Sequence, residues 1–144
     1  MSEATCFWLY LLECENGNYY TGYTKNLVVR YYQHKRGKQS AKYTRSFKPV
    51  RIAQCWKLYA PVAMALKLER YIKRQSKATK ENWIQHPEVL REMITKKLDL
   101  DFQLFPFDAA AVEKESAKLD WKQVKSGYDP FVHDAPPGDV KELS

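Results

Sequence analysis

The turn signal "ENGN" at Glu15–Asn18 constrains the fold of this chain more than any other feature of its sequence. It separates two short runs rich in apolar and aromatic residues, Phe7–Glu13 and Tyr19–Tyr23. An Asn or Asp followed by Gly between two such runs is a strong short-range signal for a β-hairpin. We therefore expect an antiparallel sheet built around this hairpin.

The length of the hairpin loop decides which side chains share a face. An even loop would put Tyr10 and Tyr20 on opposite faces of the hairpin. An odd loop, with Gly17 in the left-handed conformation of a bulge, would set Tyr10 opposite Gly22 and place both tyrosines on one face. If the two tyrosines act together, the loop must be odd.

Cap signals and periodicity predict a helix and a third strand after the hairpin. Thr24 is expected to cap a helix from about residue 25 to residue 36, which Gly37 ends. A polar, basic loop follows, and residues 50–59 then alternate as a strand does. The residues expected on one side of that strand are Val50, Ile52, Trp56 and Leu58.

Two further helices complete the predicted domain. Pro61 suits the first turn of a helix through about Lys77, and Thr79 would begin a shorter helix that ends near Pro87. The predicted fold class is therefore α+β, with a small three-stranded, mainly antiparallel sheet flanked by helices in the order β-β-α-β-α-α. This domain is expected over residues 5–86.

The rest of the chain is more acidic. Residues 87–125 are predicted to form a partly helical C-terminal extension. Within it, residues 98–107 alternate as an edge strand or a docking segment would, and Asp108 is expected to cap a helix that runs to residue 125. Residues 126–144 are rich in turn formers and are predicted to be a flexible tail.

Charge is distributed unevenly along the chain. Residues 1–86 hold 16 Lys and Arg against 5 Asp and Glu, whereas residues 87–144 hold 8 against 12. No acid stands between Glu15 and Glu69, while eleven basic residues do. A surface of one sign favours a polyanion, because each neutralised phosphate releases condensed counterions. The simpler interpretation is a basic surface that only keeps the protein soluble.

Hydropathy and cysteine content indicate the compartment in which the protein is expected. No run of 18 apolar residues suggests a membrane span, and the N-terminal stretch lacks the basic leader of a signal peptide. The cysteines are odd in number and form no CxxC pair, which argues against a disulfide framework. They are Cys6, Cys14 and Cys55. A reduced, cytoplasmic protein is expected.

The predicted helix over residues 25–36 carries candidate functional groups on one stripe. Arg30 and His34 are one turn apart on that stripe. A basic residue at the margin of an apolar helix face usually packs the methylene groups of its side chain on that face and keeps its charge in solvent. The hairpin, however, is expected to bring Tyr10 and Tyr20 to the same end of the sheet.

Glu69 is the only acid between Glu15 and Glu81. The simpler interpretation is an ion pair with Lys73, one helical turn away. A lone carboxylate in a basic region is also what a divalent cation needs, since Mg²⁺ is commonly held by one or two carboxylates together with waters and substrate phosphate.

Together these residues resemble the GIY-YIG nuclease domain, above all its small single-domain bacterial members and the N-terminal domain of the bacterial excision nuclease. The likeness covers roughly residues 5–84. It is carried by "WLY" at residues 8–10, "YTG" at residues 20–22, Arg30, His34 and Glu69, and by the later stretches "AKYT" (residues 41–44), "PV" (residues 49–50) and "ALKLERYIK" (residues 65–73).

The resemblance implies metal-dependent hydrolysis of phosphodiester bonds. It implies that Glu69 holds one Mg²⁺ or Mn²⁺ ion and that Arg30 contacts the scissile phosphate. Tyr20 would orient or deprotonate the attacking water, with His34 or Tyr10 as alternatives or relays. The general base therefore stays open.

Two further residues, Gly22 and Thr24, would be structural, giving close backbone approach and the helix cap. The sequence departs from the family pattern at Tyr23, where some members carry a Lys. Asn82 is the only candidate nearby for an Asn that some relatives use downstream of the Glu.

Further contacts to nucleic acid would come from the basic loop and the start of the third strand. The candidates are Lys38, Lys42, Tyr43, Arg45, Lys48 and Arg51. DNA is the expected substrate, structured or damaged DNA by family analogy, and RNA is a further candidate. The alternatives are a non-catalytic nucleic-acid-binding module on the same scaffold and an adaptor that binds a protein partner through the acidic extension. The sequence indicates no oligomeric state.

Overall fold

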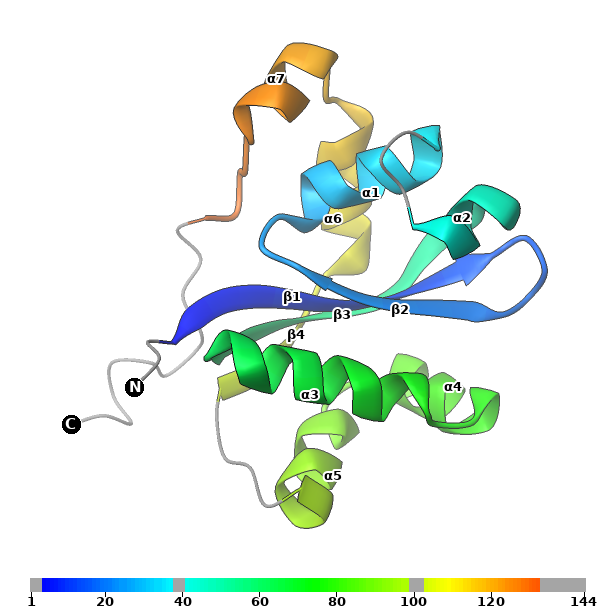
Figure 1. Cartoon of the computed structure of the whole chain (residues 1–144), viewed down its shortest axis with the longest axis vertical. Helices are drawn as coiled ribbons and strands as arrows, with labels where there is room; N and C mark the ends of the chain where they lie inside the picture. The colour runs from blue at the N-terminus through cyan, green and yellow to red at the C-terminus, as the bar shows by residue number, and fades with distance from the viewer. Residues whose placement is uncertain (1–3, 38–40, 99–102, 133–144) are drawn as a thin grey trace.

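The computed structural model describes residues 4–37, 41–98 and 103–132. In these residues a four-stranded antiparallel sheet, in the order β2-β1-β3-β4, carries helices on both faces (Figure 1). The strands are β1 (Thr5–Cys14), β2 (Tyr19–Thr24), β3 (Pro49–Ala60) and β4 (Gln103–Phe107). The helices are α1 (Leu27–Arg36), α2 (Lys42–Ser46), α3 (Val62–Lys73), α4 (Lys77–Gln85), α5 (Val89–Leu98), α6 (Ala109–Ala117) and α7 (Trp121–Ser126).

Strand β1 is buried on both faces, because each face of the sheet has its own core. Leu9 and Leu11 pack with Leu68 of α3 on the lower face in Figure 1. Trp8 and Leu12, which alternate with them, pack with α1 and α6 on the upper face. Period-two alternation therefore becomes a continuous apolar run in β1, as expected for a central strand covered twice.

The sheet has four strands, so the predicted three-stranded sheet is corrected. The fourth, β4, comes from the acidic extension and pairs with β3 from Cys55↔Phe107 to Tyr59↔Gln103. Of the two interpretations of residues 98–107, the edge strand holds for residues 103–107, whereas residues 99–102 lie outside the described residues. Pro106 fits an edge strand, because one side of such a strand needs no ladder hydrogen bond.

The predicted alternation of β3 is wrong at its beginning. Ile52 packs on the upper core, whereas Trp56 and Leu58 pack on the lower one, and Val50 is exposed. The register with β1 shifts between Leu11↔Gln54 and Leu12↔Ile52, which leaves one extra residue in β3. Such a bulge inverts the faces on either side of it.

Helix α1 begins at Leu27, so the prediction that Thr24 caps it is wrong. Asn26 is the N-cap, and its side chain accepts a hydrogen bond from the Val29 amide at 3.2 Å. The Asn26 side-chain amide also donates to the carbonyl of Gly127, more than a hundred residues away. This tertiary contact favours Asn26 over Thr24, whose hydroxyl instead accepts from the Asn26 backbone amide at 3.2 Å.

Four other helix boundaries also differ from the prediction. The basic loop contains the short helix α2, and Pro61 is the N-cap of α3 rather than part of its first turn. Ser76 caps α4 by accepting from the Thr79 amide, so the helix begins before Thr79. The helix predicted from Asp108 to residue 125 is broken into α6 and α7, because Asp120 and Gln123 form a capping box that starts α7.

The extension packs on both faces of the sheet: Leu90 and Ile94 of α5 join the lower core, and the segment that follows β4 packs on the upper face. Helix α6 lies beside α1 (Figure 1). The ammonium group of Lys57, which is buried, donates to the Phe131 carbonyl at 2.8 Å and lies 5.0 Å from the Trp8 ring. Residues 126–132 of the predicted flexible tail therefore include a docked segment, and residues 133–144 lie outside the described residues.

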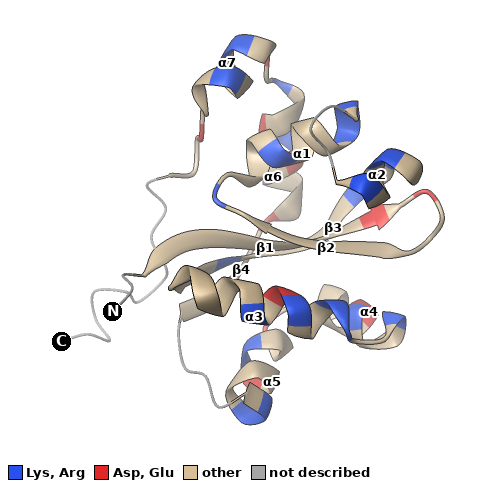
Figure 2. Cartoon of the chain, viewed as in Figure 1, with Lys and Arg blue, Asp and Glu red and all other residues tan. Residues whose placement is uncertain are grey.

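Basic residues lie on both sides of the hairpin turn. Lys and Arg lie along α2 above the turn and along α3 and α4 below it (Figure 2). Tyr43 of α2 reaches the turn through a hydrogen bond to Asn16, and Lys77 of α4 lies beside Gly17. In the parts of the chain that the structure describes, no helix has the length and hydropathy needed to cross a membrane.

Candidate active site

The β1–β2 hairpin presents Tyr10 and Tyr20 on the face that α1 covers. Tyr10 lies opposite Gly22, and Gly17 has a φ of 82°, so the odd loop that the tyrosines require is confirmed. The two ring centroids are 6.4 Å apart. A β-carbon at Gly22 would lie 2.5 Å from the Tyr10 hydroxyl oxygen, so only glycine leaves room for this ring.

A chain of hydrogen bonds joins Tyr10 to α1 and α2. The Tyr10 hydroxyl lies 3.0 Å from Nε2 of His34, and Nδ1 of His34 lies 2.9 Å from the hydroxyl of Thr44. The Thr44 hydroxyl donates to the carbonyl of Ala41 at 3.1 Å. The positive charge of the nearby Arg30 guanidinium acts on the same hydroxyl and lowers its pKa, against the larger effect of burial.

Burial decides the protonation of these groups. It lowers the pKa of His34 to about 4, with a further contribution from the positive charge of Arg30. It raises the pKa of Tyr10, where the neighbouring Tyr20 adds to the effect and Arg30 opposes it. It also raises the pKa of Tyr20. At neutral pH the imidazole is therefore uncharged and both phenols keep their protons.

Glu69 approaches this cluster from the other face of the sheet. It lies on α3, which packs on the lower core, and β2 is the edge strand that α3 adjoins. Its carboxylate raises the pKa of both Tyr10 and Tyr20, so its charge acts on both rings. The predicted site residues Tyr10, Tyr20, Arg30, His34 and Glu69 therefore converge on one region that straddles the β2 edge.

Lys73 occupies the same edge. Its ammonium nitrogen lies 3.5 Å from the Glu69 carboxylate and 6.0 Å from the centre of the Tyr20 ring. The simpler interpretation of Glu69, an ion pair one turn along the helix, is thus present. The Glu69 side chain is 16% exposed and Lys73 48% exposed, so the pair opens to solvent on its lysine side.

The donor set at Glu69 fits a divalent cation that relies on the substrate for most of its ligands. The described residues contain no cluster of three or more His, Cys, Asp or Glu side chains. The protein therefore offers a single carboxylate here, and Mg²⁺ commonly takes its other ligands from water and substrate phosphate. Such an ion would compete with the Lys73 ammonium for the charge of the carboxylate.

The basic residues predicted to contact nucleic acid fall into three groups. Lys42, Arg45 and Lys48 are exposed on or next to α2. Arg51 is paired with Glu13 at 2.6 Å, which offsets its charge. Lys38 lies outside the described residues.

Aromatic rings continue outward from the site. Tyr43 stacks on Tyr20 with ring centroids 6.1 Å apart and an angle of 26° between the planes. Phe47 lies 5.2 Å beyond Tyr43 and is 39% exposed. The rings of Tyr20, Tyr43 and Phe47, which we call the aromatic row, run from the buried hydrogen-bond chain to the protein surface.

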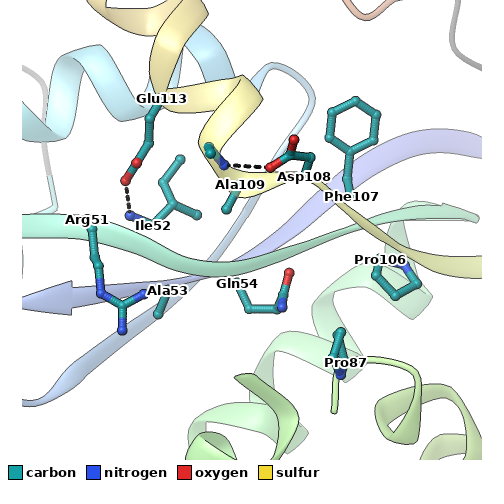
Figure 3. Close-up of a pocket in the computed structure, with 11 residues that line it drawn as sticks. Arg51, Ile52, Ala53, Gln54, Pro87, Pro106, Phe107, Asp108, Ala109 and Glu113 are labelled. Carbon is teal, nitrogen blue, oxygen red and sulfur yellow. Dashed lines mark hydrogen bonds between the residues drawn. The ribbon is translucent and has the colours of Figure 1, made fainter. Parts of the chain in front are cut away.

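A groove of about 560 Å³ lies along the part of the β3 edge that β4 leaves uncovered (Figure 3). Its two acids both serve local structure. Asp108 caps α6 by accepting from the Ala110 amide at 3.0 Å, and Glu113 accepts from the Ile52 amide at 2.6 Å. Arg51 is the only predicted site residue in its lining, so this groove is distinct from the candidate active site.

Comparison with known proteins identifies the family. Residues 6–82 match the family described as the GIY-YIG catalytic domain, which is more than half of the chain. The chain belongs to the GIY-YIG family. Membership implies a nuclease domain that binds nucleic acid, as the resemblance predicted from Tyr10, Tyr20, Arg30, His34 and Glu69.

The chain is also similar to individual proteins. A UPF0213 protein of Fusobacterium nucleatum is 42% identical over 82 residues, covering 57% of this chain and 80% of the relative. A UPF0213 protein of Syntrophus aciditrophicus is 39% identical over 82 residues, covering 56% and 93%. The solution NMR structure of a UPF0213 protein from Bacillus halodurans shows 34% identity over 56% of this chain and 84% of that chain, with a TM-score of 0.37. These names state no activity.

Sequence reasoning missed one residue of this GIY-YIG site. Thr44 is fully buried and holds the imidazole of His34. The only signal in the sequence was the position of Thr44 in "AKYT" at residues 41–44. This motif contributes to the family resemblance but assigns no role to Thr44. Spacing could not reveal the contact, because α2 had been taken for loop.

Proposed function

We propose that this protein is a metal-dependent endonuclease that hydrolyses phosphodiester bonds in DNA, including structured or damaged DNA, with RNA as an alternative substrate. The observation that supports the proposal is the convergence of Tyr10, Tyr20, Arg30, His34 and Glu69 at the β2 edge, between the basic residues of α2 and those of α3. We also propose a reducing compartment such as the cytoplasm, because an odd number of cysteines without a CxxC pair does not suit a disulfide framework.

Each polar group of the site has a distinct task in this proposal. Arg30, held by a hydrogen bond to Gln33 and close to the Tyr10 hydroxyl, presents its guanidinium to the non-bridging oxygens of the scissile phosphate. The half-buried Tyr20 hydroxyl, which keeps its proton at neutral pH, orients the attacking water. A divalent cation held by Glu69 would neutralise the negative charge that develops on the phosphate.

The test compares the wild type with Glu69→Gln and Arg30→Ala on labelled linear, nicked, forked and single-stranded DNA, with Mg²⁺, Mn²⁺ or EDTA. Removing a charge that stabilises the transition state should lower the cleavage rate by a factor of about 100 or more. Glu92→Gln is the matched control, because Glu92 is an exposed helical acid on α5.

Two outcomes would contradict the proposal. Cleavage that persists undiminished in Glu69→Gln would assign the activity to a contaminant or to a different site. Salt-sensitive binding of DNA without cleavage under any metal condition would favour a non-catalytic nucleic-acid-binding module on the same scaffold.

A further inference from the structure

The aromatic row ends in an exposed ring among positive charges. Phe47 follows the last turn of α2 and is held by its backbone amide, which donates to the Tyr43 carbonyl at 2.9 Å. The Tyr43 hydroxyl accepts from the Asn16 side chain at 2.9 Å, so the ring beneath Phe47 is anchored to the hairpin turn. Phe47 thus lies on a supported platform, with one part of its surface open to solvent.

The surroundings of Phe47 favour a polyanion over an apolar partner. Arg45 and Lys48 flank it in sequence, Lys42 begins the same helix, and all three are exposed. Helix α2 contains no acid. A ring that is 39% exposed and surrounded by cations offers stacking and phosphate contacts together, the combination that proteins use to bind single-stranded nucleic acid.

We propose that Phe47 stacks on the base of an unpaired nucleotide next to the scissile phosphate, so that the enzyme selects substrates with a single-stranded segment at the cleavage site. This inference rests on the proposed function, because the aromatic row begins at Tyr20. A duplex cannot use the platform in the same way, since its base faces are already stacked on one another. Lys42, Arg45 and Lys48 contact the backbone of the same strand.

The experiment measures binding in EDTA, where no cleavage occurs, by fluorescence anisotropy of labelled oligothymidylate and of a duplex of equal length. Stacking of one base contributes enough that Phe47→Ala should weaken single-strand binding about fivefold or more, while duplex binding changes less than about twofold. Trp121→Ala is the matched control, because Trp121 is an aromatic residue of α7 that is 63% exposed.

The outcomes separate this inference from the proposed function. Equal losses for single strand and duplex, or no loss for either, would overturn the stacking role of Phe47 while leaving the nuclease proposal in place. If the wild type binds neither nucleic acid, both proposals fail.

A second inference comes from the buried hydrogen-bond chain. The Thr44 hydroxyl has one proton, which it donates to the Ala41 carbonyl. In its contact with His34 it must therefore be the acceptor. Nδ1 of His34 therefore carries the ring proton, and Nε2 accepts from the Tyr10 hydroxyl. With its own proton donated to His34, the Tyr10 oxygen presents its lone pairs to the nearby guanidinium of Arg30.

The direction of this chain points to a positioning task. His34 and Thr44 are both 0% exposed, and Tyr10 is 2% exposed, so these groups do not face an attacking water in this structure. We infer that Thr44 is a positioning residue that acts through His34 and Tyr10 to orient Arg30. We also infer that none of the groups in this series of hydrogen bonds is the general base. This inference also rests on the proposed function, in which Arg30 contacts the phosphate.

The test uses Thr44→Val, which keeps the shape and removes the hydroxyl, and Thr44→Ser, which restores it. Nitrogen NMR of the His34 ring should show the Nδ1–H tautomer in the wild type and in Thr44→Ser, and a changed tautomer in Thr44→Val. The kcat of Thr44→Val should fall about tenfold or more, and Thr44→Ser should recover most of it. Thr21→Val is the matched control, because the buried Thr21 hydroxyl has no hydrogen-bond partner among the described residues.

Either of two results would overturn this inference. One is an unchanged Nδ1–H tautomer in Thr44→Val, and the other is a changed tautomer with full kcat. The tautomer is measured without substrate, so this part of the result stands even if no cleavage is found and the proposed function fails.

Discussion

Gly22→Ala tests whether the close approach of β2 to Tyr10 sets the geometry of the site. The new β-carbon would lie 2.5 Å from the Tyr10 hydroxyl oxygen and 2.6 Å from the ring carbon that bears it. Ordinary contacts are about 3.5 Å or longer, so the ring must move by about 1 Å. Tyr10 is 2% exposed, and its hydrogen bond to His34 is 3.0 Å long, so such a movement breaks that bond.

The expected magnitude follows from these contacts. Overpacking a buried site costs about 1–3 kcal/mol, and loss of the Tyr10–His34 hydrogen bond costs about 1 kcal/mol. Replacing a strand glycine by alanine returns about 0.5–1 kcal/mol. The free energy of unfolding should therefore fall by about 1–3.5 kcal/mol, measured by urea denaturation at constant m-value.

A double-mutant cycle identifies the cause. Tyr10→Leu removes the ring atoms that the new β-carbon would meet, so Gly22→Ala should cost about 1–2 kcal/mol less in that background. If Gly22→Ala costs the same in both backgrounds, the steric argument is refuted. Gly37→Ala is the comparison, because Gly37 has a φ of 77° and no atom of the described residues lies within 4 Å of the position of its β-carbon, so its cost should come mainly from backbone strain and be independent of Tyr10.

Two further predictions follow from buried groups. The pKa of His34 is about 4 in the folded protein and about 6.5 in the unfolded chain. The unfolded chain therefore binds a proton more readily between these pH values, and the free energy of unfolding should fall by up to about 3 kcal/mol as pH drops from 6.5 to 4. Urea denaturation at pH 7 and pH 4.5 should show a weaker pH dependence for His34→Gln than for the wild type or for His86→Gln, and coincident profiles would contradict this. Glu113→Ala leaves the Ile52 amide without its acceptor and should cost about 1–3 kcal/mol. Glu115→Ala, which removes only a surface pair with Lys118, should cost less than about 1 kcal/mol, and equal costs would show that the Glu113 contacts are unimportant.

Local chemistry made much of the site predictable from the sequence. The "ENGN" turn, the need for glycine opposite Tyr10 and the end of α1 at Gly37 each depend on residues that are neighbours in the chain or across one hairpin. The four-residue spacing of Arg30 and His34 places them one turn apart in any helix. For these features a short stretch of sequence contains the physical cause, so pattern and structure agree.

Tertiary packing decided the rest. Ile52 lies on the opposite face from the predicted one because of a bulge in the pairing of β3 with β1. Asn26, and not the predicted Thr24, caps α1, and its side chain also donates to the distant Gly127 carbonyl. Strand β4 joined the sheet because β3 had an open edge, and α2 enclosed His34 and thereby set its protonation. Burial and long-range hydrogen bonds depend on which elements pack together, and the residues that determine them lie tens of positions apart in the sequence.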